Sequence, residues 1–380
     1  MQRAILSTYR VLYRFQGGEH GRNPASGLVD INGTFYGTTP NGGGAGCGLG
    51  CGTIYSITPA GVENVLHRFG QGTDGAIPYT KTIVVNGTLY GTTIGGGKYD
   101  NGTVYSISTT GEENVLHSFN PATGDGSEPS ADLLYANGML YGTTYTGGGA
   151  SSVCKPTGCG TAYSLTLKGK ERVLHRFPGF EADDGQLPMS GLVELKGKLY
   201  GTTATGGGYR RGIVFSLTTA GTERVLHSFG GAPDGDDPQA DLIDVHGTLY
   251  GTTIEGGTNS YHCGSSCGTV FSITKSGVER VLHSFSGEND GFEPEAPLLN
   301  VKGTMYGTTA AGGATTTQCG NGCGSIYRIT KGGAESVVYY FVGGTSGRYP
   351  LAGLLYVNGT LYGTAAYGGD GDGVVFALTL

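Results

Sequence analysis

The sequence lacks the features of a membrane-spanning, nucleic-acid-binding or fibrous protein. It has no run of about 20 apolar residues, the length that a helix needs to cross a membrane. It has no basic excess, since 23 Lys and Arg face 30 Asp and Glu, whereas binding to phosphate backbones needs clustered positive charge. Glycine does not occupy every third position, which excludes a collagen-like triple helix. The apolar part of Met1–Leu6 is too short for a secretion signal, so we expect either a processed chain or one without a signal.

Glycine is nevertheless abundant. It accounts for 75 of the 380 residues, whereas average usage is roughly 7%. A disordered chain is excluded because 37% of the residues are apolar, and 24 Tyr and 13 Phe need burial. Helices are disfavoured because each glycine inside one costs about 1 kcal/mol relative to alanine. The composition therefore predicts a folded, turn-rich β protein.

Two short motifs recur along the whole chain. The motif Tyr-Gly-Thr-Thr, whose last copy ends in Ala365, begins at Tyr36, Tyr90, Tyr141, Tyr200, Tyr250, Tyr306 and Tyr362. A second motif of the type Val-Leu-His-x-Phe begins at Val11, Val65, Val115, Val173, Val225, Val281 and Val337. Units of about 54 residues fill the chain, so we expect a single domain over residues 1–380.

Each unit reads as four short strands separated by turns. In the first complete unit these are residues 24–31, 34–39, 52–58 and 62–69, with an Asn-Gly hairpin signal between the first two. A repeated four-stranded unit of this length is typical of a β-propeller, so the sequence predicts an all-β, seven-bladed β-propeller.

The two ends of the chain are complementary. The chain opens with a strand of the fourth type, about residues 9–15, and ends with a strand of the third type. We expect the N-terminal strand to complete the last blade, a 3+1 closure that removes the free edge. An open β-solenoid is the main alternative, and it does not require complementary ends. The expected repeats are about 24–69, 78–119, 129–177, 188–229, 238–285, 294–341, and 350–380 together with 8–15.

Two polar residues recur with the repeat. Histidine occupies the second motif at His67, His117, His175, His227 and His283, while Tyr13 and Tyr339 replace it in the other copies. Strict alternation places Val65, His67 and Phe69 on one face. The loop motif Asp-Gly-x-x-Pro begins at Asp74, Asp125, Asp184, Asp234 and Asp290. We interpret both residues as structural. The alternative, a carboxylate ring that binds Ca²⁺ or a cationic ligand, has one carboxylate per loop and makes a poor multidentate site, so we expect no cofactor and no metal.

The eight cysteines form four local pairs, each between the second and third strands of a unit. The pairs are Cys47–Cys51, Cys154–Cys159, Cys263–Cys267 and Cys319–Cys323. Zinc would need four ligands at one point, and pairs in separate blades cannot meet, so we predict disulfides. Disulfides indicate an oxidising compartment, which favours an extracellular or cell-surface location.

The repeat as a whole resembles a known one. Leu-x-x-x-x-Gly-Thr-Leu-Tyr-Gly-Thr-Thr-x-x-Gly-Gly, Gly-Thr-Val-Phe-Ser-Ile-Thr, Val-Leu-His-Ser-Phe and Asp-Gly-x-x-Pro together resemble the GloVer tandem repeat of Gloeobacter-like and Verrucomicrobia-like bacterial proteins. The resemblance extends over about residues 9–380. It implies a bacterial extracellular or cell-surface protein, often one with a sorting or anchoring tail, and no such tail is recognisable here. It brings no catalytic residues.

A single site is expected where the pattern breaks, on the loop face or in the central channel. Two loops lack the Asp of Asp-Gly-x-x-Pro and place an arginine in the same register. We predict a cluster that binds an anionic sugar, formed by His20, Arg22, Arg348, Tyr349, Asp370 and Asp372. The alternative is that these blades diverged because they form the closure. A second, weaker patch comprises Tyr209, Arg210, Arg211, Tyr261 and His262.

The sequence favours a secreted or cell-surface module for binding, adhesion or structure that is directed at a glycan or a cell-surface partner. The alternative is a glycan-active enzyme near blades one and seven. A polysaccharide lyase would use His20 or Tyr349 as the base and Arg22 and Arg348 to neutralise a uronate carboxylate. A hydrolase would instead need paired carboxylates, for which Asp370 and Asp372 with Asp74 are the candidates. The sequence does not indicate the oligomeric state.

Overall fold

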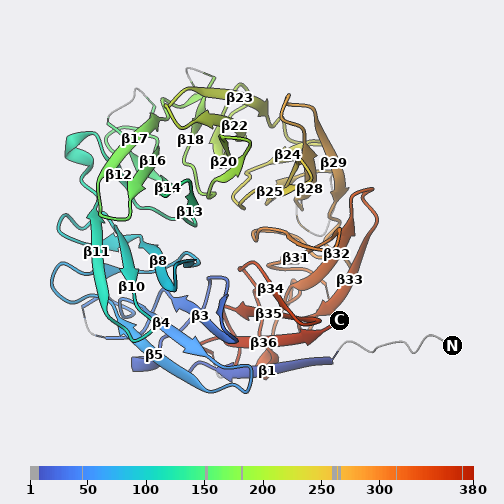
Figure 1. The fold of residues 1–380 in the computed structure, drawn as a ribbon. Helices are drawn as coiled ribbons and strands as arrows, with labels where there is room; N and C mark the ends of the chain where they lie inside the picture. Colours follow the sequence, from blue (N-terminus) through green and yellow to red (C-terminus); the bar gives the residue numbers. More distant parts are fainter. Residues whose placement is uncertain are drawn as a thin grey trace.

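The computed structural model describes residues 8–44, 46–149, 153–180, 183–258, 263, 267–313, 315–369 and 371–380. These residues form a ring of seven four-stranded antiparallel sheets, around which the chain runs once (Figure 1). The predicted seven-bladed β-propeller is confirmed. In each blade the first strand lies nearest the axis, where neighbouring first strands contact one another, and the fourth lies at the rim.

The strands are named here by their position in the blade. The first strands are β2 (Val29–Ile31), β7 (Ile83–Val85), β13 (Leu134–Ala136), β19 (Val193–Leu195), β25 (Ile243–Val245), β30 (Leu299–Val301) and β34 (Leu355–Val357). The second strands are β3 (Thr34–Thr39), β8 (Thr88–Thr93), β14 (Met139–Thr144), β20 (Lys198–Thr203), β26 (Thr248–Thr253), β31 (Thr304–Thr309) and β35 (Thr360–Ala365). The third strands are β4 (Thr53–Ile57), β10 (Thr103–Ile107), β16 (Thr161–Thr166), β22 (Ile213–Thr218), β28 (Thr269–Ile273), β32 (Ser325–Thr330) and β36 (Val374–Thr379). The fourth strands are β5 (Glu63–Arg68), β11 (Glu113–Ser118), β17 (Glu171–Arg176), β23 (Glu223–Ser228), β29 (Glu279–Ser284), β33 (Glu335–Tyr340) and β1 (Thr8–Arg14).

Short strands and 3₁₀ turns lie in the loops. Two-residue strand pairs join the Asp-Gly-x-x-Pro loop to the loop after the second strand in four blades: β6 (Gly75–Ala76) with β9 (Gly95–Gly96), β12 (Gly126–Ser127) with β15 (Thr146–Gly147), β18 (Gly185–Gln186) with β21 (Thr205–Gly206), and β24 (Gly235–Asp236) with β27 (Glu255–Gly256). Single 3₁₀ turns are η1 (Gly18–His20), η2 (Pro121–Thr123) and η4 (Gly344–Ser346).

The ring closes through its N-terminal strand. β1 pairs antiparallel with β36, which gives the last blade the strand order β1-β36-β35-β34. The amide of Phe15 continues this pairing by donating to the carbonyl oxygen of Gly373 at 3.0 Å. The predicted 3+1 closure is therefore confirmed, with β1 one residue earlier than expected.

Aromatic rings pack each blade against the next. A Phe that follows each fourth strand contacts a Tyr or Phe of the next blade's third strand, and the ring centroids lie 5.1–5.3 Å apart. The pair at the closure, Phe15 with Tyr55, has the same 5.1 Å separation and both rings are fully buried. The junction that closes the ring is thus packed like the others.

Local geometry explains the repeated glycines and corrects one expectation. In the first hairpin turn, Asn32 and Gly33 have φ of 53° and 83°, the left-handed pair that a type I′ turn requires. Each pairing of a third with a fourth strand contains a β-bulge; in the first blade Val65 pairs with Tyr55 and His67 with Ile54. Leu66 is the extra residue, so Val65 and His67 face opposite sides of the sheet, and strict alternation was wrong there.

Candidate functional site

The loops that lead into the first strands surround a cavity at one end of the channel. Because strands within a blade are antiparallel, these loops share a face with the disulfide loops between second and third strands. The cavity has a volume of about 140 Å³. Its walls come from the residues that follow the proline of each Asp-Gly-x-x-Pro loop and from the equivalent residues of blades one and seven. The third residue after each proline forms one ring of positions: Gly27, Lys81, Asp132, Gly191, Asp241, Pro297 and Gly353.

This ring of positions is narrow. A Cβ on Gly191 would lie 2.7 Å from the carbonyl oxygen of Asp132 and 3.0 Å from a carboxylate oxygen of Asp241, so only glycine leaves room for both neighbours. A Cβ on Gly27 would lie 3.1 Å from the side chain of Lys81. The small residues therefore let the charged side chains of other blades converge on the axis.

Lys81, Asp132 and Asp241 form a charged trio in the cavity. The Nζ atom of Lys81 lies 3.3 Å from Oδ2 of Asp132, and the backbone amide of Lys81 donates to Oδ1 of the same carboxylate at 2.8 Å. In the equivalent arrangement two blades on, the amide of Gly191 donates to Oδ1 of Asp241 at 2.5 Å. Backbone amides thus hold both carboxylates in place, and part of the Lys81 side chain, 36%, stays open to the channel.

The trio has one more carboxylate than ammonium groups, and its pKa values reflect this. Burial, followed by the Asp132 carboxylate, raises the pKa of Asp241 to about 7. The Asp132 carboxylate, with help from Asp241, raises the pKa of Lys81 despite the opposing effect of burial. Near neutral pH the trio therefore offers an ammonium donor, a carboxylate acceptor and a carboxyl group that exchanges a proton.

Glu295 and Tyr79 also line the cavity, and the Asp237 carboxylate acts on Glu295. Burial and then the nearby Glu293 and Asp237 charges raise the pKa of Glu295 to about 7. Burial raises the pKa of Asp237 to about 6, although Nε2 of Gln239 donates to its Oδ2 at 2.9 Å. Tyr79 is 39% exposed. These charges favour hydroxyl-bearing or cationic ligands over anionic ones.

The residues of the predicted His–Arg–Tyr–Asp cluster contact different partners in the structure. Nδ1 of His20 lies 3.4 Å from a carboxylate oxygen of Glu63, toward the rim of the ring. Nε of Arg22 lies 3.2 Å from Oδ1 of Asp372, so these two predicted residues do meet. Asp370 lies outside the described residues.

Arg348 and Tyr349 have other partners. The guanidinium of Arg348 donates to the carbonyl oxygen of Gln318 at 2.9 Å and lies 5.6 and 5.8 Å from the ring centroids of Tyr349 and Tyr367. Arg22 and Arg348 occupy the same register in their loops, since each forms a bridge to the loop after the second strand of its own blade. They line separate surface recesses.

The second predicted patch is described only in part. Arg211 forms an ion pair with Asp236, and the guanidinium of Arg210 lies 3.9 Å from the ring centroid of Phe180. Tyr209 is 67% exposed. Tyr261 and His262 lie outside the described residues.

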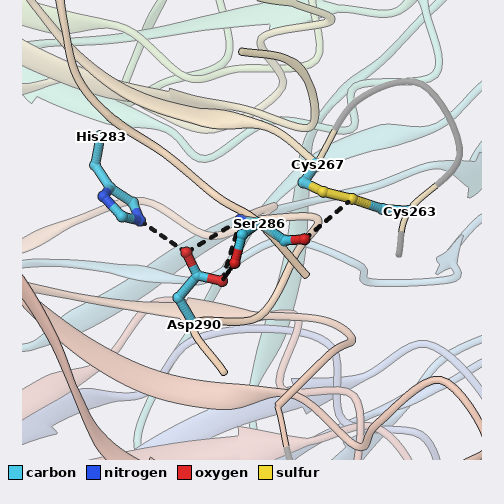
Figure 2. The surroundings of a disulfide bond; sticks show 5 residues. All are labelled: Cys263, Cys267, His283, Ser286 and Asp290. Carbon is cyan, nitrogen blue, oxygen red and sulfur yellow. Dashed lines mark hydrogen bonds and ion pairs between the residues drawn. A yellow bond between two sulfur atoms is a disulfide. The ribbon is translucent and has the colours of Figure 1, made fainter. Parts of the chain in front are cut away.

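The recurring His and Asp are bonded to each other. Nε2 of His67 lies 2.8 Å from Oδ2 of Asp74, whose Oδ1 accepts a hydrogen bond from the amide of Gly75 at 2.7 Å. The same pair recurs at His117–Asp125, His175–Asp184, His227–Asp234 and His283–Asp290, with separations of 2.9–3.1 Å. Figure 2 shows the last of these, with the Asp290 carboxylate between the His283 ring and Ser286.

The four predicted disulfides are present. The carbonyl oxygen of the second cysteine accepts an amide from the residue before the next blade's proline, as Cys51 does from Ile77 at 2.8 Å. In Figure 2 the disulfide of Cys263 and Cys267 lies beside the His–Asp pair of its blade, with Sγ of Cys263 4.0 Å from the carbonyl oxygen of Ser286. The disulfide loops thus brace the face that carries the cavity.

Comparison with known proteins identifies the family to which this repeat belongs. A family model described as the Gloeobacter/Verrucomicrobia repeat matches residues 3–155 and 152–377. The chain belongs to this family. No curated protein sequence matches it.

Two solved structures also align with this Gloeobacter/Verrucomicrobia repeat protein. One is a gluconolactonase from Xanthomonas campestris, with 12% identity and a TM-score of 0.48 over 98% of this chain and 90% of the other. The second is a luciferin-regenerating enzyme, with 12% identity and a TM-score of 0.45 over 98% of this chain and 95% of the other. Within the part of the chain that the structure describes, no helix is both long and apolar enough to cross a membrane.

The sequence of this Gloeobacter/Verrucomicrobia repeat did contain a signal for the His–Asp pairs. The motif that has Tyr13 instead of His is followed by a loop with His20 instead of Asp. The motif with Tyr339 is followed by a loop with Ser346. The two positions change together because their side chains form one contact. Neither motif taken alone predicts the pairing.

Proposed function

We propose that the protein is a secreted or cell-surface binding module that takes a carbohydrate at the mouth of its central channel. One observation carries the proposal: Lys81, Asp132 and Asp241 stand where the other four repeats have glycine or proline, and all three converge on one cavity. Positions that maintain the ring repeat around it, whereas a single ligand needs side chains that differ from blade to blade.

The chemistry of the cavity supports a hydroxyl-bearing ligand. Carboxylates accept hydrogen bonds from sugar hydroxyls, and the Lys81 ammonium donates to hydroxyl or ring oxygens. The partly exposed ring of Tyr79 offers an apolar face on which a sugar ring can stack. The surplus of carboxylates at the cavity disfavours a uronate at this point.

The proposed location follows from the disulfides. Four of them sit in loops of the cavity face, and such bonds persist in oxidising compartments. We propose that this face meets the ligand outside the cytoplasm.

Arg348 provides a second contact region in this proposal. Its guanidinium lies close to the rings of Tyr349 and Tyr367, a combination of cation and aromatic surface that suits an acidic sugar. His20 and Arg22 face Glu63 and Asp372 instead, so protein carboxylates already lie beside both side chains.

A glycan array followed by titration calorimetry tests the proposal. Asp132→Asn and Asp241→Asn keep the size of each side chain and remove its charge, so we expect each to weaken binding about 10- to 100-fold, the effect of one charge-assisted hydrogen bond. Glu112→Gln, an exposed residue in the β10–β11 turn at the other end of the blade, is the matched control. Absence of binding across neutral and acidic glycans refutes the carbohydrate assignment, and binding that only Arg348→Ala weakens moves the site to the second region.

The alternative function is glycan cleavage, and the same trio favours it. Asp132 and Asp241 combine a carboxylate with a carboxyl group whose pKa is about 7, the two states that acid–base cleavage of a glycosidic bond requires. Incubating the protein with each bound glycan and measuring new reducing ends or an unsaturated product distinguishes the two. Turnover that Asp241→Asn abolishes makes the protein an enzyme, and binding without turnover makes it a module.

A further inference from the structure

Four junctions between blades hold a cluster of ligand-type side chains that the channel does not use. Each cluster takes a His and an Asp from one blade and the first Glu of the next blade's fourth strand. The clusters are His67–Asp74–Glu113, His117–Asp125–Glu171, His175–Asp184–Glu223 and His227–Asp234–Glu279. In each, one ligand atom from every residue lies within 4.8 Å of the others. Two ligands of one metal ion are at most about 4.2 Å apart, so small side-chain shifts bring all three onto a common ion.

The clusters contain buried polar atoms that no protein group satisfies. Oε1 of Glu113 is buried without a hydrogen-bond partner, and so are the corresponding atoms of Glu171, Glu223 and Glu279. A buried carboxylate oxygen without a hydrogen-bond donor can bind a cation without breaking an existing hydrogen bond.

The orientation of the first two ligands is already fixed. The amide of Gly75 holds Oδ1 of Asp74, which leaves Oδ2 directed at Nε2 of His67. The two carboxylates lie near each other with one imidazole, a set that is stabilised when a divalent cation replaces the missing positive charge. One nitrogen and two or three oxygen donors are typical of first-row transition metals and too few for Ca²⁺, which takes six to eight oxygens.

We propose that these four junctions are binding sites for a divalent first-row transition metal such as Zn²⁺, each joining two adjacent blades. The ion would be held by the His and Asp of one blade and by the Glu of the next. The junction between blades five and six has the same residue types, His283, Asp290 and Glu335, but it is not one of the four groups whose ligand atoms lie within 4.8 Å of one another, and Oδ1 of Asp290 also accepts a hydrogen bond from the Ser286 hydroxyl. The remaining two junctions have other residues and serve as internal contrasts. At the closure Tyr13 and His20 replace His and Asp, and between blades six and seven the three positions are Tyr339, Ser346 and Tyr9.

Metal titration of the intact protein tests this. After dialysis against a chelator, we expect calorimetry with Zn²⁺ to give about four sites per chain and Zn²⁺ to raise the melting temperature, while Ca²⁺ does neither. Co²⁺ should give visible d–d absorption that Zn²⁺ abolishes. Fewer than one high-affinity Zn²⁺ per chain, or stabilisation by Ca²⁺ alone, overturns the proposal.

Two adjacent glutamates give the matched pair of variants. Glu113→Gln should lower the number of sites from four to three without loss of metal-free stability, because it removes a carboxylate buried beside Asp74. Glu112→Gln, which is exposed, should leave four. The Asp132→Asn/Asp241→Asn double variant should also leave four. Loss of Zn²⁺ binding in that variant, or four sites in Glu113→Gln, overturns the assignment to the junctions, and neither result depends on whether the channel binds a glycan.

Discussion

The closure of the ring rests on Phe15, and its replacement measures how much that closure contributes. Phe15 is fully buried and its ring lies 5.1 Å from those of Tyr13 and Tyr55. Phe15→Ala should lower the free energy of unfolding by about 3–5 kcal/mol, the usual cost of emptying a buried phenylalanine site. Phe119→Ala empties the equivalent site of the second blade, where Phe119 packs against Tyr163 at 5.2 Å, and should cost a similar amount.

The two variants should differ in which strand pairing opens locally. β11 is joined to β10 by a short turn, whereas β1 and β36 come from opposite ends of the chain and are held together by pairing and packing alone. Urea denaturation gives the free energies, and hydrogen exchange gives the local opening. Phe15→Ala should speed hydrogen exchange of the β36 amides at urea concentrations well below those that unfold the whole protein. Phe119→Ala should not have this effect on the β10 amides. A loss under about 1 kcal/mol, or unchanged exchange in β36, would refute this account of closure.

Three further predictions concern the channel, the repeat and the loops. Folding raises the pKa of Asp241 from 3.8 to about 7, so its stabilising protonation is present at pH 4 and is lost as the pH rises through 7. The melting temperature of Asp241→Asn relative to wild type should therefore be higher at pH 8 than at pH 4, and a pH-independent difference contradicts this. Gly37→Ala would place a Cβ 2.6 Å from the Tyr55 hydroxyl and should destabilise the protein by about 1–3 kcal/mol in urea denaturation, whereas an unchanged midpoint would show that the strand can move. Replacing Cys47 and Cys51 by Ala opens a four-residue separation and should cost about 2 kcal/mol, with faster proteolysis of the loop; equal protease resistance would show that the loop needs no brace.

The sequence predicts the fold well because the information is repeated. Seven copies of the same strand and turn signals outweigh the ambiguity of any one copy, and the complementary ends specify the closure. The β-bulge at Leu66 was missed because alternation counts residues and cannot detect an extra one in only one of two paired strands.

The candidate site was harder to predict. Lys81, Asp132 and Asp241 are 51 and 109 residues apart in sequence, and each looks like an ordinary charged residue three positions after a proline. Only the ring geometry shows that this register faces the axis. Arg22 and Arg348 lie in the two loops that interrupt the Asp-Gly-x-x-Pro motif. In the copies that keep the motif, however, its Asp has a structural role, because it bonds a histidine and accepts the amide of the next glycine, as Asp74 does.

The His–Asp–Glu clusters have a consequence for how such a ring is inherited. Two of their three members belong to one repeat and the third to the next, so a duplicated or transplanted repeat carries an incomplete set at each end. Neighbouring copies can exchange freely only while they keep the same three residues. Where Tyr339, Ser346 and Tyr9 stand instead, both neighbours differ from the common pattern. The unit that evolution must preserve is therefore the border between blades, and a designer who wishes to add or remove a blade should cut through its middle.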